Sequence, residues 1–359
     1  MSKQSKPAFA KKSSREMQPS VLRQAIIRKL PNRLSAKAEI LLPAVPGLAD
    51  HYAQGLGATW AALGRHFNAT ELEYLKTTLA DTLKQAFDAS PYSRVAVAYE
   101  TDPPPKTSLT WHMSIRTSTI EDEYAEWVAV RTPPLFGHYP DSKVMDLARS
   151  LGTPSDVTVL DVGAGTGRNT LPLAREGFHT DAVELAPALA NILRQEVEKE
   201  KLAVRVFEGS ILTQTVELPE NYYGMIFLAE VVPHFRGAEQ IRTVFDTAIR
   251  SLVPGGTLLF NTFVAMDGFK PDDLARQISE VMWCRVFTRH DLQIAAAGHP
   301  IECISDESTL EYERAHQPAE QWPPTGWYEA WCVGQDAFDL SATKNPMEVR
   351  WLTYRKKQI

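Results

Sequence analysis

The stretch VTVLDVGAGTG, residues 157–167, constrains the fold more than any other part of this chain. It begins with a short apolar run rich in β-branched residues, which predicts a strand buried on both faces of a parallel sheet. Glycine then stands at positions 163, 165 and 167. Because glycine has no Cβ and tolerates positive φ, the chain can turn sharply there and a ligand can approach its backbone. Residues 168–175 are predicted to form the next helix, whose free amides can receive an anionic group.

An acidic residue lies near the end of the next predicted strand, residues 180–185. Glu184 follows Gly167 by 17 positions, and a carboxylate at that place can accept hydrogen bonds from both hydroxyls of a ribose. An NAD-binding site uses the same contact, so the spacing alone fits a dinucleotide or another nucleoside. The glycines favour the second, because the dinucleotide pattern G-x-G-x-x-G requires glycine or alanine where Arg168 stands.

Four more segments follow the glycine turn in order: AVEL, GSI, MIFLAEVVPHF and LVPGGTLLF. Together with VLDVGAGTG they resemble the class I S-adenosylmethionine (SAM)-dependent methyltransferase family over residues 144–263, with a continuation to the C-terminus. They do not identify a subfamily. The resemblance implies SAM as the cofactor and methyl transfer as the activity. It also implies an α/β fold, a Rossmann-like doubly wound sheet of seven strands in the order 3-2-1-4-5-7-6 whose last strand is antiparallel.

The resemblance places the cofactor contacts at the carboxyl ends of four strands. They are Asp161, Gly163, Ala164, Gly165 and Gly167 along the methionine part of SAM, Glu184 at the ribose, Leu185 on the adenine, Ser210 and Ile211 at the adenine edge, and Leu228 and Ala229 at the SAM amino group. Many members of the family have aspartate where this chain has Ser210. The contact to the adenine amine is therefore expected from a hydroxyl or from the backbone.

The methyl acceptor is expected beside the loop after the fourth strand. His234 is the candidate general base, because ligands of open α/β sheets bind outside the carboxyl ends of the strands and histidine has a suitable pKa. Two alternatives stay open: His234 only orients its loop, and Glu230 caps the following helix instead of touching the acceptor. The predicted substrate pocket consists of Phe136, His138, Tyr139, Glu230, His234 and Phe235, and the three aromatic residues at 136–139 either begin a lid or pack a junction.

The charge of the chain is uneven. Residues 1–33 contain nine Lys/Arg and one acidic residue, a net charge of +8; because the whole chain carries −6, the remainder carries −14. Such an acidic body is unlike a nucleic-acid-binding surface, so a nucleic-acid partner is not expected. Residues 1–40 are predicted to be a basic, disordered tail, with a nucleic-acid arm, an organelle transit segment and a partner-binding arm as alternatives.

An accessory α+β region is expected at 41–130, between this tail and the SAM-binding domain. Its predicted elements are helices at 48–67, 69–88 and 119–130 and a hairpin of strands at 94–100 and 109–117. Asn68 and Glu71 match a capping box at the start of the second helix. The methyltransferase domain is predicted at 131–359, with a lid at 131–152 and a tryptophan-rich insertion at 306–347.

Composition narrows the cellular setting. No apolar run is long enough to span a bilayer, and no signal-peptide pattern is present. The three cysteines form no C-x-x-C pair, so we expect no metal site and no disulfide framework, and a reducing, cytoplasmic location. The function that these patterns favour is methylation of a small molecule at O, N or C. The alternatives are an RNA or protein methyltransferase that uses the tail and accessory region, and a non-catalytic SAM-binding regulatory protein. The oligomeric state is left open.

Overall fold

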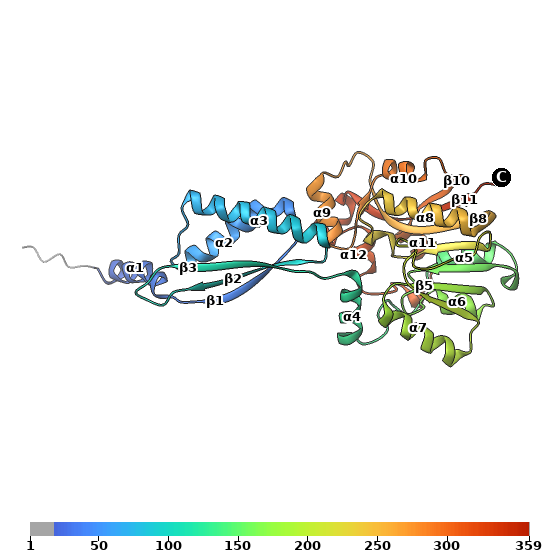
Figure 1. The fold of residues 1–359 in the computed structure, drawn as a ribbon, viewed down its shortest axis with the longest axis horizontal. Helices are drawn as coiled ribbons and strands as arrows, with labels where there is room; N and C mark the ends of the chain where they lie inside the picture. Colours follow the sequence, from blue (N-terminus) through green and yellow to red (C-terminus); the bar gives the residue numbers. More distant parts are fainter. Residues whose placement is uncertain (1–17, 359) are drawn as a thin grey trace, which may run out of the picture.

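The computed structural model describes residues 18–358. Two regions lie end to end and give an elongated molecule (Figure 1). We call residues 18–117 the accessory region and residues 118–358 the Rossmann-like region. The accessory region occupies the left of Figure 1 and the Rossmann-like region the right.

The accessory region is a three-stranded antiparallel sheet with two helices on one face. Its elements are α1 (Pro19–Lys29), β1 (Lys37–Pro43), α2 (Ala49–Ala62), α3 (Ala69–Ala89), β2 (Arg94–Thr101) and β3 (Leu109–Arg116), and the strand order is β1-β2-β3. α3 begins where the capping box predicts, since Asn68 Oδ1 accepts from the Glu71 amide at 2.9 Å and Glu71 Oε2 from the Asn68 amide at 2.8 Å. Leucines four residues apart on α3 are fully buried with Trp60 of α2, which fastens both helices to the sheet.

Regular secondary structure begins within residues 1–40, which the sequence predicts to be a disordered tail. Residues 19–29 are helical, and residues 37–43 form β1, whose register pairs Lys37 with Glu100 and Pro43 with Arg94. The two strands of the expected hairpin are β2 and β3, and β1 adds a third strand on the free side of β2. α1 buries none of its side chains, whereas β1 is held by its ladder to β2. The predicted tail at 1–17 lies outside the described residues.

The Rossmann-like region is built on one sheet with the order β6-β5-β4-β7-β8-β11-β10. Numbered within this sheet, that order is 3-2-1-4-5-7-6, and β11 runs antiparallel to both of its neighbours, which confirms the predicted fold class. A short strand, β9, pairs with the end of β8. The strands are β4 (Thr158–Val162), β5 (His179–Glu184), β6 (Val204–Glu208), β7 (Tyr223–Leu228), β8 (Leu252–Ala265), β9 (Val286–Phe287), β10 (Ile301–Ser308) and β11 (Met347–Lys356).

Helices cover both faces of this sheet (Figure 1). They are α4 (Ile120–Val130), α5 (Ser142–Ser150), α6 (Thr170–Arg175), α7 (Pro187–Glu200), α8 (Ala238–Ser251), α9 (Asp273–Val281), α10 (Arg289–Ala296), α11 (Thr309–His316) and α12 (Tyr328–Cys332). The predicted insertion at 306–347 consists of the end of β10, then α11, α12 and their connections. Among residues 18–358, no helix is both long and apolar enough to cross a membrane.

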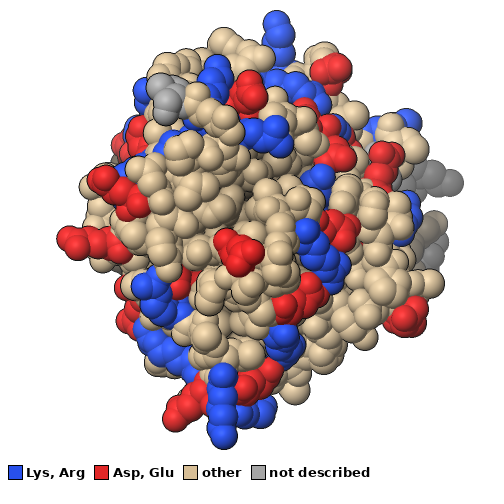
Figure 2. All heavy atoms as spheres, turned by 90° about the vertical axis from the view of Figure 1, so that its right-hand side faces the viewer, with Lys and Arg blue, Asp and Glu red and all other residues tan. Residues whose placement is uncertain are grey.

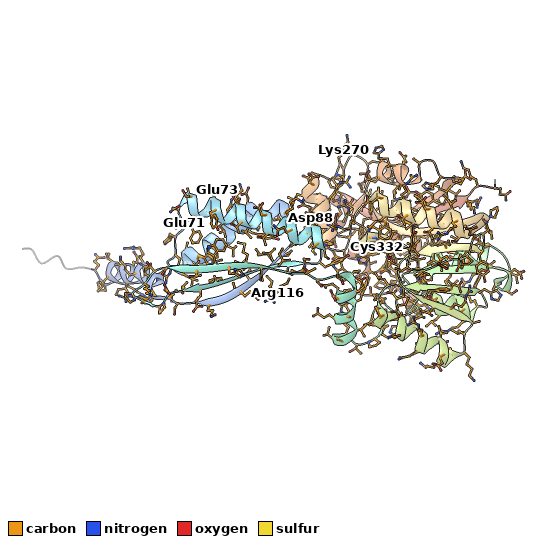
Figure 3. The ribbon with its side chains drawn as sticks, in the orientation of Figure 1. Glu71, Glu73, Asp88, Arg116, Lys270 and Cys332 are labelled. Carbon is orange, nitrogen blue, oxygen red and sulfur yellow. The ribbon has the colours of Figure 1, made fainter. Side chains whose placement is uncertain are left out.

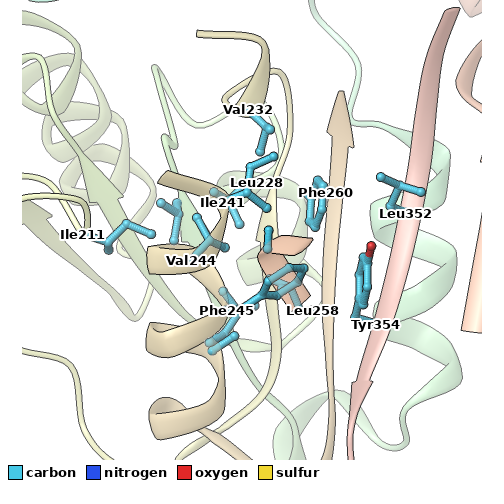
Figure 4. Packing of buried hydrophobic residues seen from close by; sticks show 14 of the residues in the cluster. Ile211, Leu228, Val232, Ile241, Val244, Phe245, Leu258, Phe260, Leu352 and Tyr354 are labelled. Carbon is cyan, nitrogen blue, oxygen red and sulfur yellow. The ribbon is translucent and has the colours of Figure 1, made fainter. Parts of the chain in front are cut away.

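The main core lies between α8 and the strands that carry the site. Phe260 of β8 and Tyr354 of β11 stack with ring centroids 5.6 Å apart, and Phe245 of α8 meets Tyr354 edge-on at 4.9 Å (Figure 4). Burying one such side chain contributes about 1.5–3 kcal/mol. The same cluster includes residues of β4, β5 and β7, whose carboxyl ends border the cavity described below.

Candidate active site

A cavity of about 540 Å³ opens at the carboxyl ends of β4, β5 and β7. Its floor consists of the glycine turn after β4, the end of β5, residues 209–212 and residues 228–231. Its roof comes from α4, the loop at residues 131–136, residues 282 and 283, and the tryptophan-rich insertion. The floor thus comes from the doubly wound sheet and the roof from segments before and after it.

The glycine turn needs glycine at two positions for packing as well as for backbone conformation. Gly163 has φ +78°, and a Cβ there would overlap Val231 Cγ2. Gly167 has φ +96°, and its Cβ would lie 2.6 Å from Leu193 Cδ1. The amide of Gly163 donates to Val183 O at 2.7 Å, which joins the turn to β5. The turn is therefore held close against its neighbours, with its open side toward the cavity.

Glu184 is the buried carboxylate of the site. Its Oε2 accepts from the Gly165 amide at 2.7 Å and its Oε1 from the Ala186 amide at 2.8 Å. Burial raises the pKa of Glu184, and the backbone amides oppose that rise. Since a carboxylate oxygen can accept two hydrogen bonds, each oxygen keeps a lone pair for the cavity, which fits the two hydroxyls of a ribose.

Asp161, at the end of β4, also lines the cavity. Its carboxylate accepts a hydrogen bond from Thr170 Oγ1 at 2.6 Å. Burial raises the pKa of Asp161 to about 7, so its charge changes near neutral pH.

Arg168 joins the turn to the loop after β7. Its guanidinium donates to Asp141 at 2.7 Å and to Glu230 at 2.6 Å, and its side chain is only 9% exposed. Burial raises the pKa of Glu230, and the charge of Arg168 opposes that rise. Glu230 has φ +61°, a conformation that is uncommon for a residue with a side chain and that concentrates at functional sites. Its amide donates to Asn261 Oδ1 at 2.6 Å, so Glu230 is fixed on both sides.

His234 ends a short 3-10 turn, Val232–His234, at the cavity wall. Its Nδ1 lies 3.1 Å from the hydroxyl of Tyr92 and its Nε2 lies 3.3 Å from the hydroxyl of Tyr124. Burial lowers the pKa of His234 to about 4, so the imidazole is neutral at physiological pH.

The roof is a cluster of aromatic rings. Trp127 of α4 stacks on Trp283 with centroids 5.0 Å apart, and Tyr124 meets both Trp283 and Phe136 edge-on at 5.9 Å. Phe136 also lies over the glycine turn, because a Cβ on Gly165 would be 3.3 Å from its ring. The roof therefore shields the cavity from bulk water on the side that faces away from the sheet.

Most of the sequence-predicted cofactor residues meet at this cavity. Those that line it are Asp161, Gly163, Ala164, Gly165, Glu184, Leu185, Ser210, Ile211, Leu228 and Ala229. Gly167 lies just behind the turn, against Leu171 and Leu193.

Four of the six predicted substrate residues line the cavity, and two do not. Phe136, Glu230, His234 and Phe235 line the cavity. His138 lines a neighbouring hollow together with Arg131 and Trp327, and Tyr139 is among the lining residues of neither. Within the predicted lid at 131–152, only the first part covers the cavity, because α5 packs Val144, Met145 and Ala148 into the core beneath the sheet.

Sequence reasoning missed the residues that complete the roof and wall. Tyr124 and Trp127 stand three positions apart on one helix face, a spacing that could have indicated a shared contact. Tyr92 and Trp283 carry no such signal, because both lie in turns and reach the site only through the tertiary fold. The sequence pattern indicates Arg168 only as a residue that breaks the dinucleotide motif, whereas in the structure it pairs with both Asp141 and Glu230.

Residues 159–256 match the family model described as "Methyltransferase domain". The matched stretch begins in β4 and ends in β8, and it contains the glycine turn, Glu184 and His234. The predicted resemblance to class I SAM-dependent methyltransferases is thereby confirmed for this part of the chain.

Two curated proteins match part of the chain. Probable ribosomal RNA small subunit methyltransferase A of Methanosphaera stadtmanae is 36% identical over 62 residues, which are 17% of this chain and 23% of that protein. Demethylmenaquinone methyltransferase of Tropheryma whipplei is 28% identical over 116 residues, which are 32% of this chain and 45% of that protein. The chain thus spans less than half the length of either relative.

Solved structures share the fold at low identity. Geranyl diphosphate C-methyltransferase from Streptomyces coelicolor A3(2), in complex with Mg²⁺, geranyl-S-thiolodiphosphate and S-adenosyl-L-homocysteine, superposes with a TM-score of 0.50 at 15% identity. The superposition covers 67% of this chain and 98% of that one. It establishes a shared fold for about two thirds of the chain and leaves the rest without a counterpart in that structure.

Proposed function

We propose that this protein is a SAM-dependent methyltransferase that acts on a small-molecule acceptor. The observation that carries the proposal is the buried carboxylate of Glu184, held by two backbone amides beside a glycine turn whose open side faces the same cavity. The match of residues 159–256 to a methyltransferase domain supports the same activity.

The residues present fit SAM. Glu184 would bind the ribose, Leu185 and Ile211 would pack on the adenine, and the turn after β4 would lie along the methionine part. When bound, SAM supplies a sulfonium methyl group that an in-line nucleophile can accept. The chain's own contribution would be to hold the acceptor close and to exclude water, and positioning of this kind can supply a large part of the rate enhancement.

The shape of the site favours a small acceptor. Aromatic rings of α4 and of residue 283 cover the cavity from above, which favours a small acceptor over a polymer at that place. At the end of the molecule farthest from the accessory region, Lys and Arg are interspersed with Asp and Glu (Figure 2). The similarity to demethylmenaquinone methyltransferase, whose name denotes a small-molecule acceptor, supports this choice.

Two residues of the cavity wall are placed to act on the acceptor. His234 is the candidate proton acceptor, because its neutral imidazole lies at the wall between two tyrosine hydroxyls. Glu230, held by Arg168, would orient the acceptor or the SAM amino group.

The donor half of the proposal is tested by calorimetric titration with SAM. Wild type and Glu200→Ala should bind equally, because Glu200 is a carboxylate at the end of α7 that pairs with Arg175 and does not line the cavity. Glu184→Ala should bind at least tenfold more weakly, since hydrogen bonds to a charged group contribute about 1.5–3 kcal/mol each. An unchanged affinity would remove Glu184 from the ribose site.

The acceptor half is tested by incubating the protein with methyl-labelled SAM and fractionated cell extract. Label in the small-molecule fraction, lost in Glu184→Ala, is the expected result. Label only in RNA or only in protein would replace the proposed acceptor class. SAM binding without transfer to any fraction would favour a regulatory SAM-binding protein.

A further inference from the structure

His234 stands between two tyrosines that come from different regions of the molecule. Tyr92 lies in the turn between α3 and β2 of the accessory region, and Tyr124 lies on α4. The Tyr92 hydroxyl is 3.1 Å from Nδ1 and the Tyr124 hydroxyl is 3.3 Å from Nε2, so each ring nitrogen has one phenol partner. Tyr124 lines the cavity, whereas Tyr92 lies behind the imidazole and is only 6% exposed.

The turn that carries Tyr92 is attached to the loop that carries His234. Arg236, two residues after His234, donates to the carbonyls of Phe87 at 2.8 Å and Asp88 at 3.0 Å, at the end of α3. The same guanidinium pairs with Glu280 of α9 at 2.7 Å. Asp88 lies at the junction of the two regions (Figure 3).

A second contact joins the accessory region to α9. The amide of Gly47 donates to Gln277 Oε1 of α9 at 2.8 Å. The ring of Tyr92 also meets Trp283 of the roof edge-on at 5.4 Å. Tyr92 is therefore packed and cannot turn away from His234 without moving the junction.

The chemistry of a neutral imidazole gives these contacts a consequence. One ring nitrogen carries a proton and the other a lone pair, and the partner of one nitrogen decides the state of the other. Burial raises the pKa of both Tyr92 and Tyr124, so both remain phenols that can donate or accept. Only the arrangement with a proton on Nδ1 leaves a lone pair on the cavity side.

We propose that Tyr92 of the accessory region is a positioning residue for His234: it accepts the Nδ1–H hydrogen bond and keeps the Nε2 lone pair directed at Tyr124 and the cavity. The accessory region then completes the active site. Both this tautomer and the role of His234 as proton acceptor rest on the proposed function, whereas the contact between Tyr92 and Nδ1 does not.

In this arrangement the acceptor's proton has a defined route. As the acceptor atom forms its bond to the methyl group, its proton passes to the Tyr124 oxygen while the Tyr124 proton passes to Nε2. No oxidant or reductant is needed. The imidazole becomes positively charged and its Nδ1–H bond to Tyr92 strengthens, and the proton is lost to water after the product leaves.

The tautomer can be measured directly by long-range ¹H–¹⁵N correlation spectroscopy on full-length protein labelled at histidine nitrogens. The His234 signals are assigned with His234→Gln. Wild type should show the Nδ1–H tautomer, and Tyr92→Phe should shift most of the population to Nε2–H. Tyr99→Phe is the matched control, because Tyr99 is a buried tyrosine of the same region that packs on Trp60, and it should leave the wild-type tautomer.

Two outcomes overturn the proposal: an Nε2–H tautomer in wild type, which needs no variant to be observed, or an unchanged tautomer in Tyr92→Phe. Titration with SAM separates this inference from the proposed function. Tyr92→Phe should keep the wild-type SAM affinity to within twofold, because Tyr92 does not line the cavity. If wild type binds no SAM, the proposed function fails while the tautomer result still decides the role of Tyr92.

Discussion

Replacing Arg168 by glutamine should destabilise the protein in a pH-dependent way. The variant removes the cation from a buried cluster and leaves the carboxylates of Asp141 and Glu230 without it. Removing one partner of a buried ion pair costs about 3–5 kcal/mol. The Glu230 side chain is 20% exposed, toward the cavity, so we expect a loss of about 3 kcal/mol in the free energy of unfolding at pH 7.5.

The pH dependence follows from the pKa of Glu230. Burial already raises it above its ordinary value of 4.5, and Arg168 is the cause that opposes the rise, so the variant should have a still higher pKa. A carboxyl group with a raised folded-state pKa stabilises the fold when protonated, and this contribution is lost as the pH rises from the unfolded value through the folded one. The difference between Arg168→Gln and wild type should therefore shrink at pH 5.

The measurement is urea unfolding of both proteins at pH 5 and pH 7.5. Arg175→Gln is the matched control, because Arg175 pairs with Glu200 at the surface with half of its side chain exposed. Exposed pairs contribute about 0.2–1 kcal/mol, so this control should lose little at either pH. A loss in Arg168→Gln no larger than that of the control, or one of equal size at both pH values, would refute the reasoning.

Three further results are expected. Gly163→Ala should lower the free energy of unfolding by about 2–4 kcal/mol in urea titrations, because it combines positive φ with an overlap on Val231; a loss below about 1 kcal/mol would mean that the turn can relax. The free energy of unfolding of Asp161→Asn should rise relative to that of wild type by about 2 kcal/mol between pH 5 and pH 8. The raised pKa of about 7 means that the fold favours protonated Asp161, and wild type loses this stabilisation as the pH rises. Parallel pH profiles of the two proteins would contradict this reasoning. Deleting residues 1–33 should change SAM affinity and small-molecule methylation by less than about twofold, since α1 buries no side chain; a tenfold loss would assign that segment to the site.

Elements with a local signature could be predicted from the sequence. The capping box of Asn68 and Glu71 marks the start of α3, and the glycine turn with Glu184 marks the floor of the cavity, because each depends on residues near one another in the chain. β1 could not be predicted in the same way. Its pairing partner β2 lies more than fifty residues further on, and its own residues, K-A-E-I-L-L-P, do not alternate between apolar and polar.

The wall and roof of the site depend on long-range contacts. Tyr92 reaches His234 across 142 positions, and Arg168 reaches Glu230 across 62. Neither contact follows from spacing: the first arises when the accessory region docks, and the second when the loop after β7 turns at Glu230 with its positive φ. The predicted substrate residues His138 and Tyr139 do not line the main cavity, whereas Phe136 of the same segment lies over the glycine turn.

Similarity to known methyltransferases covers the floor of the cavity but not most of its roof. The family model covers residues 159–256, which supply Glu184, the glycine turn and His234. Glu230, His234 and Phe235 of the proposed substrate pocket also lie within that stretch, whereas the roof residues Tyr124 on α4 and Trp283 after α9 lie outside it. The same fold with a different roof would keep its methyl donor and change its acceptor. The choice of acceptor should therefore respond to substitutions at Tyr124 and Trp283, whereas SAM affinity should respond to substitutions at Glu184.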